Sequence, residues 1–549
     1  MTRSSRRRPA AACGAAALLL VLGPGIQTRG PEAVDLLIVN GTVVDGTGRP
    51  GVRADVAIAG GAIARLGRLG GLKAAETIDA AGRVVAPGFI DVHTHADGPA
   101  ETPQLENFIR MGVTSVVAGN CGDSSADVAA ALQAIRQTGI AVNFATLIGH
   151  NTVRAAVLGA AGRPPDAAEL ERMKAHVARA MADGAVGIST GLQYVPGMYA
   201  GRDEIVELAK VAARAGGIYA SHMRNEGTRV VEAIEETIAV GEAAGCPVQI
   251  SHLKIDSPNR WGSSARLLRL IAAARKRGVD VRADQYAYTA GSSGLGIRFP
   301  DWALEGGREK TVERLADEAT WARVKADMKG LLAERGFTDL SWAVIALCRD
   351  DPSLNGLSIK QAAAKMLGRD DVEAQLETAR RLMMRSNPQM VYHFMSEDDV
   401  TGIMRDPDVM IASDSGVLQP GRGTPHPRGY GNNARVLGRY VRGMRVIPLE
   451  EAVRKMTSLP ARHLGFARRG ELREGWAADV VVFDPATVED PATFEQPHQY
   501  ATGIEDVIVN GVAVIRQGVV TGARPGQVLA RSPAGADGRP ALGFPDFRK

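Results

Sequence analysis

Side chains able to bind a metal stand at the ends of several apolar runs in this sequence. In chain order they are His93 and His95 after VVAPGFIDV, Cys121 after TSVVAGN, His222 ending GIYASH, and His252 ending PVQISH. Residues at positions i and i+2 of a strand point to the same face, so His93 and His95 can reach one ion. Any one of these residues alone would more often be a structural side chain. Four histidines at equivalent positions favour a metal site.

Cys121 lies in the phrase Asn120-Cys121-Gly122. A cysteine beside several histidines is expected to bind a metal as a thiolate. The alternative is an inert thiol in a tight glycine turn. Zinc suits a mixed set of imidazole and thiolate ligands better than magnesium or calcium, which prefer oxygen. Iron or cobalt would also fit.

Asp414 ends the last apolar run, VMIASD. A carboxylate beside a metal can accept a proton from the attacking water and later deliver it to a leaving nitrogen. The alternative is an aspartate that caps the following turn. Its place beside the predicted metal ligands favours the catalytic interpretation.

Eight apolar runs, separated by stretches of helical periodicity, position these residues between Val85 and Ser415. This alternation is typical of parallel βα units and predicts an α/β protein with a TIM-like (β/α)8 barrel. The reactive residues stand at the carboxyl ends of the runs, where such barrels carry their active sites.

Two further regions interrupt or flank the predicted barrel, which we place at residues 88–465. About a hundred residues separate the seventh run from the eighth, and their helical composition predicts an insertion at about 296–388 that could cover the barrel mouth. Short alternating strands at 31–87 and 466–549 share the phrase Val-Asn-Gly. They predict one small β-sandwich domain built from both ends of the chain, followed by a C-terminal tail.

The first 30 residues differ from the rest of this 549-residue chain. Four arginines within the first eight positions precede the apolar stretch from Ala10 to Val21. This pattern predicts a signal for export to the periplasm or the medium. An uncleaved anchor is the alternative, and the protein would be cytoplasmic if the stretch is no signal. Without these arginines the formal charge of +4 falls to near zero, and no basic patch indicates nucleic-acid binding.

Several longer phrases resemble the amidohydrolase superfamily and, within it, the N-acyl-D-amino-acid deacylase (D-aminoacylase) family. GFIDVHTHAD (88–97) alone matches only the superfamily, whereas other phrases are more specific. These are VVAGNCG (116–122), STGLQYVPGMYA (189–200), SHMRNEG (221–227), SHLK (251–254), DQYAYTAGSSGL (284–295), ASDSG (412–416) and HPRGYG (426–431).

The resemblance implies a role for each matching position. Cys121, His222 and His252 would hold a tightly bound Zn²⁺, His93 and His95 would form a weaker second site with the same cysteine, and Asp414 would be the catalytic acid and base. Positions implied to bind the substrate's α-carboxylate are Lys254, Tyr286 and Ser292, with Tyr194 and Arg224 as weaker candidates. Arg298 matches a position where relatives that prefer acidic side chains can place an arginine.

Three departures from the family pattern stand out. The fourth run ends in Ser189-Thr190, without the lysine whose carbamylated form bridges two metals in hydantoinases and dihydroorotases. Ser-Asp-Ser replaces the frequent Ser-Asp-Gly around Asp414. Asn432-Asn433-Ala434 replaces Thr-Phe-Pro, which could reshape the pocket wall.

The sequence therefore predicts hydrolysis of a small N-acyl-D-amino acid. Alternatives in the same class are a cyclic amidase of the hydantoinase or dihydropyrimidinase type and an L-specific or dipeptide amidohydrolase. A non-catalytic barrel scaffold is a further alternative, although every expected ligand position is occupied. The acyl group, the side chain and the oligomeric state stay open.

Overall fold

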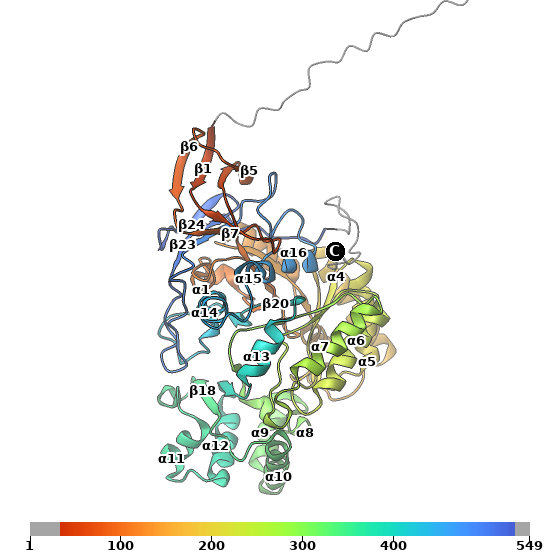
Figure 1. Ribbon diagram of the computed structural model, residues 1–549. Coiled ribbons are helices and arrows are strands. Elements are labelled where there is room, and N and C mark those ends of the chain that lie inside the picture. Colours follow the sequence, from red (N-terminus) through yellow and green to blue (C-terminus); the bar gives the residue numbers. More distant parts are fainter. Residues whose placement is uncertain (1–32, 533–549) are drawn as a thin grey trace, which may run out of the picture.

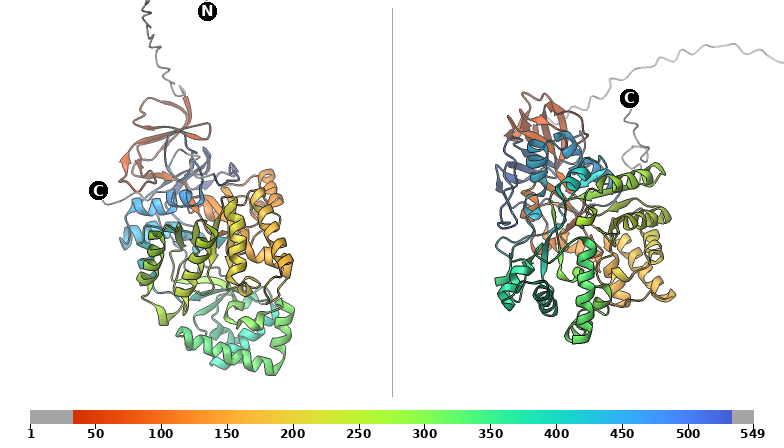
Figure 2. Two further views of the ribbon diagram at one scale, coloured as in Figure 1. Left: turned by 90° about the vertical axis from the view of Figure 1, so that its right-hand side faces the viewer. Right: turned by 60° about the horizontal axis from the view of Figure 1, so that its bottom comes forward.

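The computed structural model describes residues 33–532, and Figure 1 shows their arrangement. A central barrel lies between a β domain at one end and the insertion at the other, and further views show helices around the strands (Figure 2). The predicted export signal falls outside the described residues. Among the described helices, none combines the length and apolarity needed to cross a bilayer.

Parallel strands form the barrel wall and pair in chain order within two ladders. The first ladder contains β8 (Phe89–Asp91), β10 (Val113–Ala118) and β11 (Asn143–Thr146). The second contains β12 (Ile148–Gly149), β13 (Gly187–Gly191), β14 (Ile218–His222), β15 (Val248–Ile250), β16 (Val281–Gln285) and β20 (Val409–Ile411). The barrel prediction is confirmed.

Backbone contacts join the two ladders on both sides. β11 and β12 are one strand interrupted at Leu147, whose N–H donates to the carbonyl of Ala118 at 2.9 Å. On the other side, Asp414 N–H donates to the carbonyl of His93 at 2.9 Å. The short strands β9 (Thr94–His95) and β21 (Ser415–Gly416) then pair in parallel. The first and last strands therefore bring the predicted acid beside the predicted ligands.

Helices cover the outer face of the wall and alternate with its strands (Figure 2). They are α1 (Glu106–Ile109), α2 (Val128–Thr138), α3 (His150–Leu158), α4 (Ala167–Asp183), α5 (Arg202–Arg214), α6 (Val230–Ala244) and α7 (Ser264–Lys276). After β20 follow α14 (Arg428–Arg435), a π-helical stretch (Val436–Gly443), α15 (Leu449–Met456) and α16 (Ser458–Leu464).

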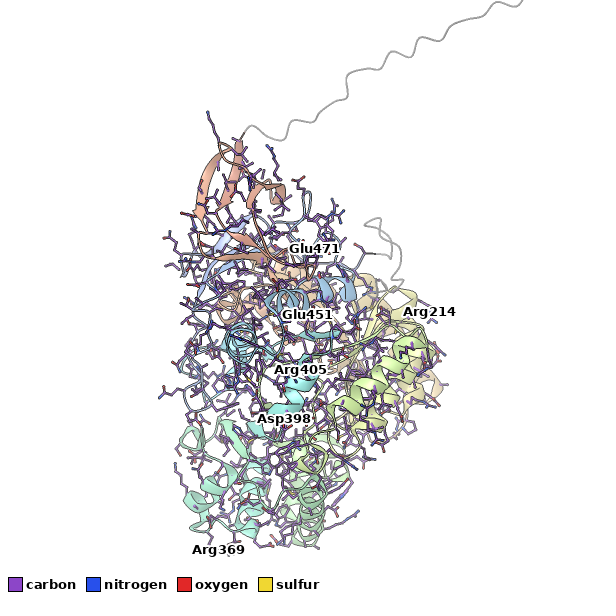
Figure 3. The ribbon with its side chains drawn as sticks, in the orientation of Figure 1. Arg214, Arg369, Asp398, Arg405, Glu451 and Glu471 are labelled. Carbon is purple, nitrogen blue, oxygen red and sulfur yellow. The ribbon has the colours of Figure 1, made fainter. Side chains whose placement is uncertain are left out.

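The sequence of α4 shows how such a helix is specified. Asp166 and Glu169 form a capping box at its start, and Gly184 ends it in the left-handed conformation. Its buried residues Met173, Val177 and Ala180 recur at helical spacing and face the strands. Exposed charged residues lie on outer surfaces, as with Arg214 at the edge of the helical layer and Arg369 at the far tip of the insertion (Figure 3).

The segment between β16 and β20 is only partly helical. Its helices are α8 (Asp301–Leu304), α9 (Gly307–Ala316), α10 (Glu318–Arg335), α11 (Ile359–Leu367), α12 (Val372–Arg385) and α13 (Glu397–Met404). It also contains an antiparallel sheet of β17 (Ala290–Gly294), β19 (Gln389–His393) and β18 (Ala343–Leu347). The helical interpretation of the sequence missed this sheet, because its strands are short and lie far apart in the chain.

The small β domain joins both ends of the described chain. One sheet contains β5 (Ala62–Gly67), β4 (Asp55–Ala59), β1 (Ala33–Val39) and β6 (Lys73–Asp79). The other contains β25 (Val519–Val520), β24 (Val512–Arg516), β23 (Ile504–Val509), β22 (Val480–Phe483), β7 (Val84–Pro87), β2 (Thr42–Val43) and β3 (Val52–Arg53). Apolar side chains of both sheets, such as Ile58 and Val482, share one buried cluster. This packing confirms the β-sandwich.

The junction between the β domain and the barrel lies at Gly88. The run VVAPGFIDVH, predicted as one barrel strand, is divided between β7 of the sandwich and β8 of the barrel. A Cβ at Gly88 would lie 2.2 Å from side-chain atoms of Thr114. Only glycine therefore lets the chain pass so close to β10.

Candidate metal centre

Tight packing of the loop after β10 places the Cys121 side chain at the barrel mouth. Cys121 has a left-handed backbone with φ of 54°, which is uncommon outside glycine. A Cβ at Gly122 would lie 2.3 Å from Asn151 Oδ1, and one at Gly191 would lie 1.9 Å from the Cys121 carbonyl oxygen. Neighbouring glycines are therefore needed for this loop to pack against the next two strands.

Ser189 stabilises the same loop from the end of β13. Its hydroxyl donates to the carbonyl of Gly119 at 2.5 Å and accepts from the N–H of Gly122 at 3.0 Å. The fourth run ends at Ser189, where hydantoinase-like proteins would have a bridging lysine. In this chain the Ser189 hydroxyl stabilises the loop that carries Cys121.

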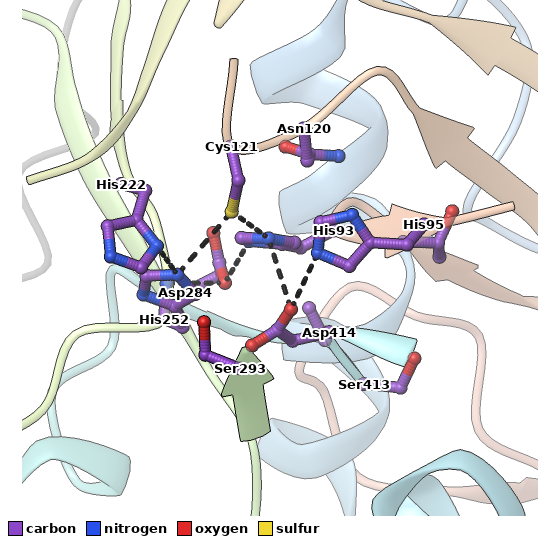
Figure 4. A network of polar contacts seen from close by, with 12 residues as sticks. His93, His95, Asn120, Cys121, His222, His252, Asp284, Ser293, Ser413 and Asp414 are labelled. Carbon is purple, nitrogen blue, oxygen red and sulfur yellow. Dashed lines mark hydrogen bonds and ion pairs between the residues drawn. The ribbon is translucent and has the colours of Figure 1, made fainter. Parts of the chain in front are cut away.

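Three histidines surround the Cys121 sulfur (Figure 4). Sγ lies 3.3 Å from His93 Nε2 and 3.6 Å from His252 Nε2, and His222 Nδ1 lies 2.8 Å from His252 Nε2. One ligand atom from each of Cys121, His222 and His252 lies within 4.8 Å of the others, and all three residues are buried. Thiolate and imidazole donors that converge in this way could hold one ion.

The chemistry of this group fits a zinc-type cation. Burial alone would raise the pKa of Cys121, but His93 and the other histidines hold it well below its ordinary value. The nitrogen His222 Nδ1 faces His252 Nε2, whereas His222 Nε2 is buried without a hydrogen-bond partner among the described residues. A sulfur and two imidazoles match the ligands of tetrahedral zinc sites with an open position.

A second group of possible ligands shares the same cysteine. It contains His93, His95, Cys121 and Asp414. Asp414 Oδ1 lies 3.0 Å from His95 Nε2 and 3.5 Å from His93 Nε2. His93 is fully buried, whereas the side chain of His95 is 36% exposed. The two histidines therefore differ in exposure, and the group that contains His95 is more open to solvent than the group of Cys121, His222 and His252.

Asp414 carries a negative charge at the mouth of the barrel. Burial alone would raise the pKa of its carboxyl group, but Arg428 and His93 hold this pKa well below the usual range. Arg428 Nη1 lies 2.8 Å from Asp414 Oδ2. The φ of Asp414 is 51°, so this residue also has a left-handed backbone. An ionised carboxylate in this position can accept a proton.

Two carboxylates behind the histidines were not found from the sequence. Asp284 Oδ1 lies 3.2 Å from His93 Nδ1 and accepts from the backbone N–H of His252 at 2.8 Å. Glu226 Oε1 lies 2.9 Å from His252 Nδ1. Asp284 stands in a predicted strand and Glu226 in the phrase SHMRNEG, but only the fold shows that they face the ligands. Arg428 was missed for the same reason.

A cavity of about 860 Å³ opens over the metal groups and is also lined by the insertion. Lys254, Tyr286 and Ser292 all line it. Lys254 Nζ lies 2.5 Å from Glu226 Oε1 and 5.7 Å from the centre of the Tyr286 ring. Ser292 donates its hydroxyl to the carbonyl of Met390 at 2.8 Å. The structure therefore brings Lys254 and Tyr286 together, while Ser292 lies on β17.

Of the two weaker substrate-binding candidates, Tyr194 faces the cavity and Arg224 does not. Tyr194 lines it, and its hydroxyl lies 3.3 Å from His222 Nδ1. Arg224 is not among the lining residues, because its guanidinium pairs with Glu236 at 2.9 Å and donates to the carbonyl of Met198. It holds a neighbouring loop instead of facing substrate.

Arg298 lines the cavity and is largely buried. It is 8% exposed, and its guanidinium carbon lies 4.4 Å from the centre of the Tyr392 ring. The nearest carboxylate oxygen, of Asp256, is 4.0 Å from Nη1. Neither Nε nor Nη1 has a hydrogen-bond partner in the described part of the chain.

The replaced triplet at Asn432 does not line the cavity, since Asn432 bonds to Ala287 and Ala412.

The barrel and its cluster define a metal-dependent hydrolase of the (β/α)8 class, with ligands at the carboxyl ends of the strands. The sequence model of the amidohydrolase family matches residues 76–515. The chain belongs to this family.

Characterised relatives extend over nearly the whole chain. D-aminoacylase of Alcaligenes xylosoxydans xylosoxydans is 39% identical over 92% of this chain and 99% of its own. N-acyl-D-glutamate deacylase of the same organism is 39% identical over 94% and 100%. The crystal structure of N-acyl-D-glutamate deacylase from Bordetella bronchiseptica, with zinc and a phosphonate mimic of the tetrahedral intermediate, is 38% identical, covers 90% and 99%, and has a TM-score of 0.78.

The shared sulfur predicts how metal content responds to substitution. Cys121→Ala removes the sulfur that belongs to both groups of candidate ligands, so the purified variant should lose its bound metal. His95→Ala alters only the more exposed group, so this variant should keep one equivalent of metal per chain. Elemental analysis by mass spectrometry of dialysed protein measures both. A Cys121→Ala protein that keeps stoichiometric metal would contradict the assignment.

Proposed function

We propose that this protein hydrolyses the amide bond of N-acyl-D-amino acids and releases a carboxylate and a free D-amino acid. The observation that carries the proposal is the group of Cys121, His222 and His252 with an ionised Asp414 beside it. The activities named for the relatives at 39% identity support the same reaction. The zinc in the Bordetella structure supports zinc as the metal.

Cys121, His222 and His252 would hold the zinc ion, and His93 and His95 would bind a weaker second ion with the same cysteine. When bound, zinc supplies Lewis acidity, which polarises a carbonyl and makes a water molecule more acidic. Asp284 would keep His93 oriented through its Nδ1, because outer carboxylates of this kind fix the ring and the tautomer of a ligand histidine.

Asp414 would move the proton during the reaction. Its carboxylate accepts a proton from water as the water oxygen attacks the carbonyl carbon, and a tetrahedral intermediate forms. Asp414 then donates this proton to the amide nitrogen as the C–N bond breaks. The amine leaves, and the acyl group keeps the new oxygen. Arg428 and the histidines stabilise the anionic form that accepts the proton first.

Lys254 and Tyr286 would bind the α-carboxylate of the substrate. Lys254 Nζ donates to Glu226 Oε1 at 2.5 Å and to the carbonyl of His252 at 3.1 Å, and it also lies 2.9 Å from His252 Nδ1. Lys254 lines the cavity, where its positive charge would attract the carboxylate. Burial alone would lower the pKa of Lys254, but Glu226 keeps it raised, so the ammonium stays charged.

The competing interpretations have weaker support. A cyclic amidase of the hydantoinase type would need a substitute for the missing lysine at Ser189, where the hydroxyl already supports the cysteine loop. A scaffold without activity would not retain the full ligand set and an ionised Asp414.

We further propose that the protein acts outside the cytoplasm, on the basis of its basic and apolar N-terminal sequence.

Replacing Asp414 tests its role in proton transfer. Asp414→Asn keeps the shape but removes the proton acceptor, so kcat should fall by about 10²–10⁴-fold. Zinc held by Cys121, His222 and His252 should remain. Steady-state kinetics with N-acetyl-D-amino acids and metal analysis of the same sample measure both effects. Asp123→Asn, an exposed acid lining the same cavity, is the control and should stay active. A zinc-loaded Asp414→Asn enzyme with wild-type turnover would refute the role.

Arg298 supports a preference for acidic side chains. Its Nε and Nη1, which have no hydrogen-bond partner among the described residues, can donate to a second carboxylate, so N-acetyl-D-glutamate should be a better substrate than N-acetyl-D-leucine. Arg298→Ala should lower kcat/KM for the glutamate derivative by about 10–100-fold, from the loss of a buried charged contact. The leucine derivative should change little. Arg349→Ala, an exposed arginine of the same cavity, is the control. Equal activity on both substrates, unchanged in Arg298→Ala, would contradict the preference.

A further inference from the structure

Glu226 contacts more of the metal site than any role in the proposed reaction requires. It lies four residues after His222 and is 3% exposed. Its Oε1 lies 2.9 Å from His252 Nδ1 and 2.5 Å from Lys254 Nζ. Its Oε2 lies 3.7 Å from His222 Nε2. One buried carboxylate therefore faces both histidines that share the group with Cys121.

Two charged groups lie beside His252 Nδ1, Glu226 Oε1 at 2.9 Å and Lys254 Nζ at 2.9 Å. A carboxylate only accepts hydrogen bonds and an ammonium only donates them, so Glu226 favours a proton on Nδ1 and Lys254 opposes it. With the proton on Nδ1, the neutral ring has its lone pair on Nε2. This nitrogen points to the cluster, 3.6 Å from Cys121 Sγ and 2.8 Å from His222 Nδ1. Of these two neighbours, only Glu226 can stabilise the tautomer of His252 that binds a metal through Nε2.

The same carboxylate acts on His222 in the opposite sense. Here Nε2 faces Glu226 Oε2, and Nδ1 faces His252 and the hydroxyl of Tyr194. His222 Nε2 has no other partner among the described residues, and the electrostatic field of Glu226 favours a proton there. The lone pair of His222 is then on Nδ1. Two adjacent histidines thus present different nitrogens to one ion.

Lys254 holds Glu226 in position. A buried carboxylate without a positive partner would be unstable or would take up a proton. Lys254 Nζ neutralises it at 2.5 Å and is itself anchored at 3.1 Å to the carbonyl of His252. Gln193 Nε2 contacts the second carboxylate oxygen at 3.4 Å. These contacts fix both oxygens relative to the two imidazole rings.

We propose that Glu226 is a positioning residue that sets complementary tautomers of His222 and His252 and thereby raises the affinity of the site for zinc. The inference rests on the zinc-dependent function proposed above. Carboxylates that accept from metal-binding histidines typically contribute about 10–100-fold to metal affinity.

The test compares Glu226→Gln with a matched control. Glu204 is also buried, 7% exposed, accepts from His150 Nε2 at 2.8 Å and pairs with Arg154, but it lies away from the metal groups. Zinc affinity is measured by competition with a chelator in the absence of substrate, on protein shown to be folded by circular dichroism. Glu226→Gln should bind zinc about 10–100-fold more weakly. Glu204→Gln should bind it as the wild type does.

Wild-type zinc affinity in Glu226→Gln, or an equal loss in Glu204→Gln, would overturn the proposal. If Glu226→Gln is not recovered folded, Glu226→Asp, which moves the carboxylate by one methylene group, is compared with Glu204→Asp by the same criteria. Because the measurement uses zinc alone, it is independent of the amide hydrolysed. Absence of D-amino-acid release with an intact effect of Glu226 on zinc affinity would refute the proposed function only.

Discussion

The approach of three histidines to the Cys121 sulfur is the constraint on which the site depends. Three residues of the site, each in the loop after its strand, have a left-handed backbone, with φ of 54° at Cys121, 37° at His252 and 51° at Asp414. Such a backbone costs about 1–2 kcal/mol per residue, and it persists where surrounding structure fixes it. The barrel provides that structure through the glycine loops beside Cys121 and the backbone bond from Asp414 to His93.

The buried charges around this point occur in compensated pairs. Glu226 faces Lys254, Asp414 faces Arg428, and Asp284 faces His93. The opposite charges keep Glu226, Lys254 and Asp414 ionised in an environment that would otherwise favour their neutral forms. Arg298 differs, because it stacks on Tyr392 and its Nε and Nη1 have no hydrogen-bond partner among the described residues.

Much of the barrel and the convergence of the candidate ligands could be predicted from the sequence, because strand ends and the His-x-His spacing are local patterns. The alternating flanks likewise indicated the sandwich. Contacts between distant segments could not be predicted: Glu226 meets Lys254, and Arg428 meets Asp414, only after folding. The burial of Arg298 against Tyr392 of β19 and the pairing of Arg224 with Glu236 of α6 also depend on such distant contacts.

A hydrolysis screen of paired D and L N-acetyl amino acids tests the proposed zinc-dependent reaction most directly. The protein is first stripped with a chelator and then titrated with zinc. We predict no turnover without metal, release of D-amino acids that rises to a maximum near one equivalent of zinc, and little release from the L series. Absence of turnover for every D substrate in protein that carries zinc, or turnover unaffected by removal of the metal, would contradict this prediction.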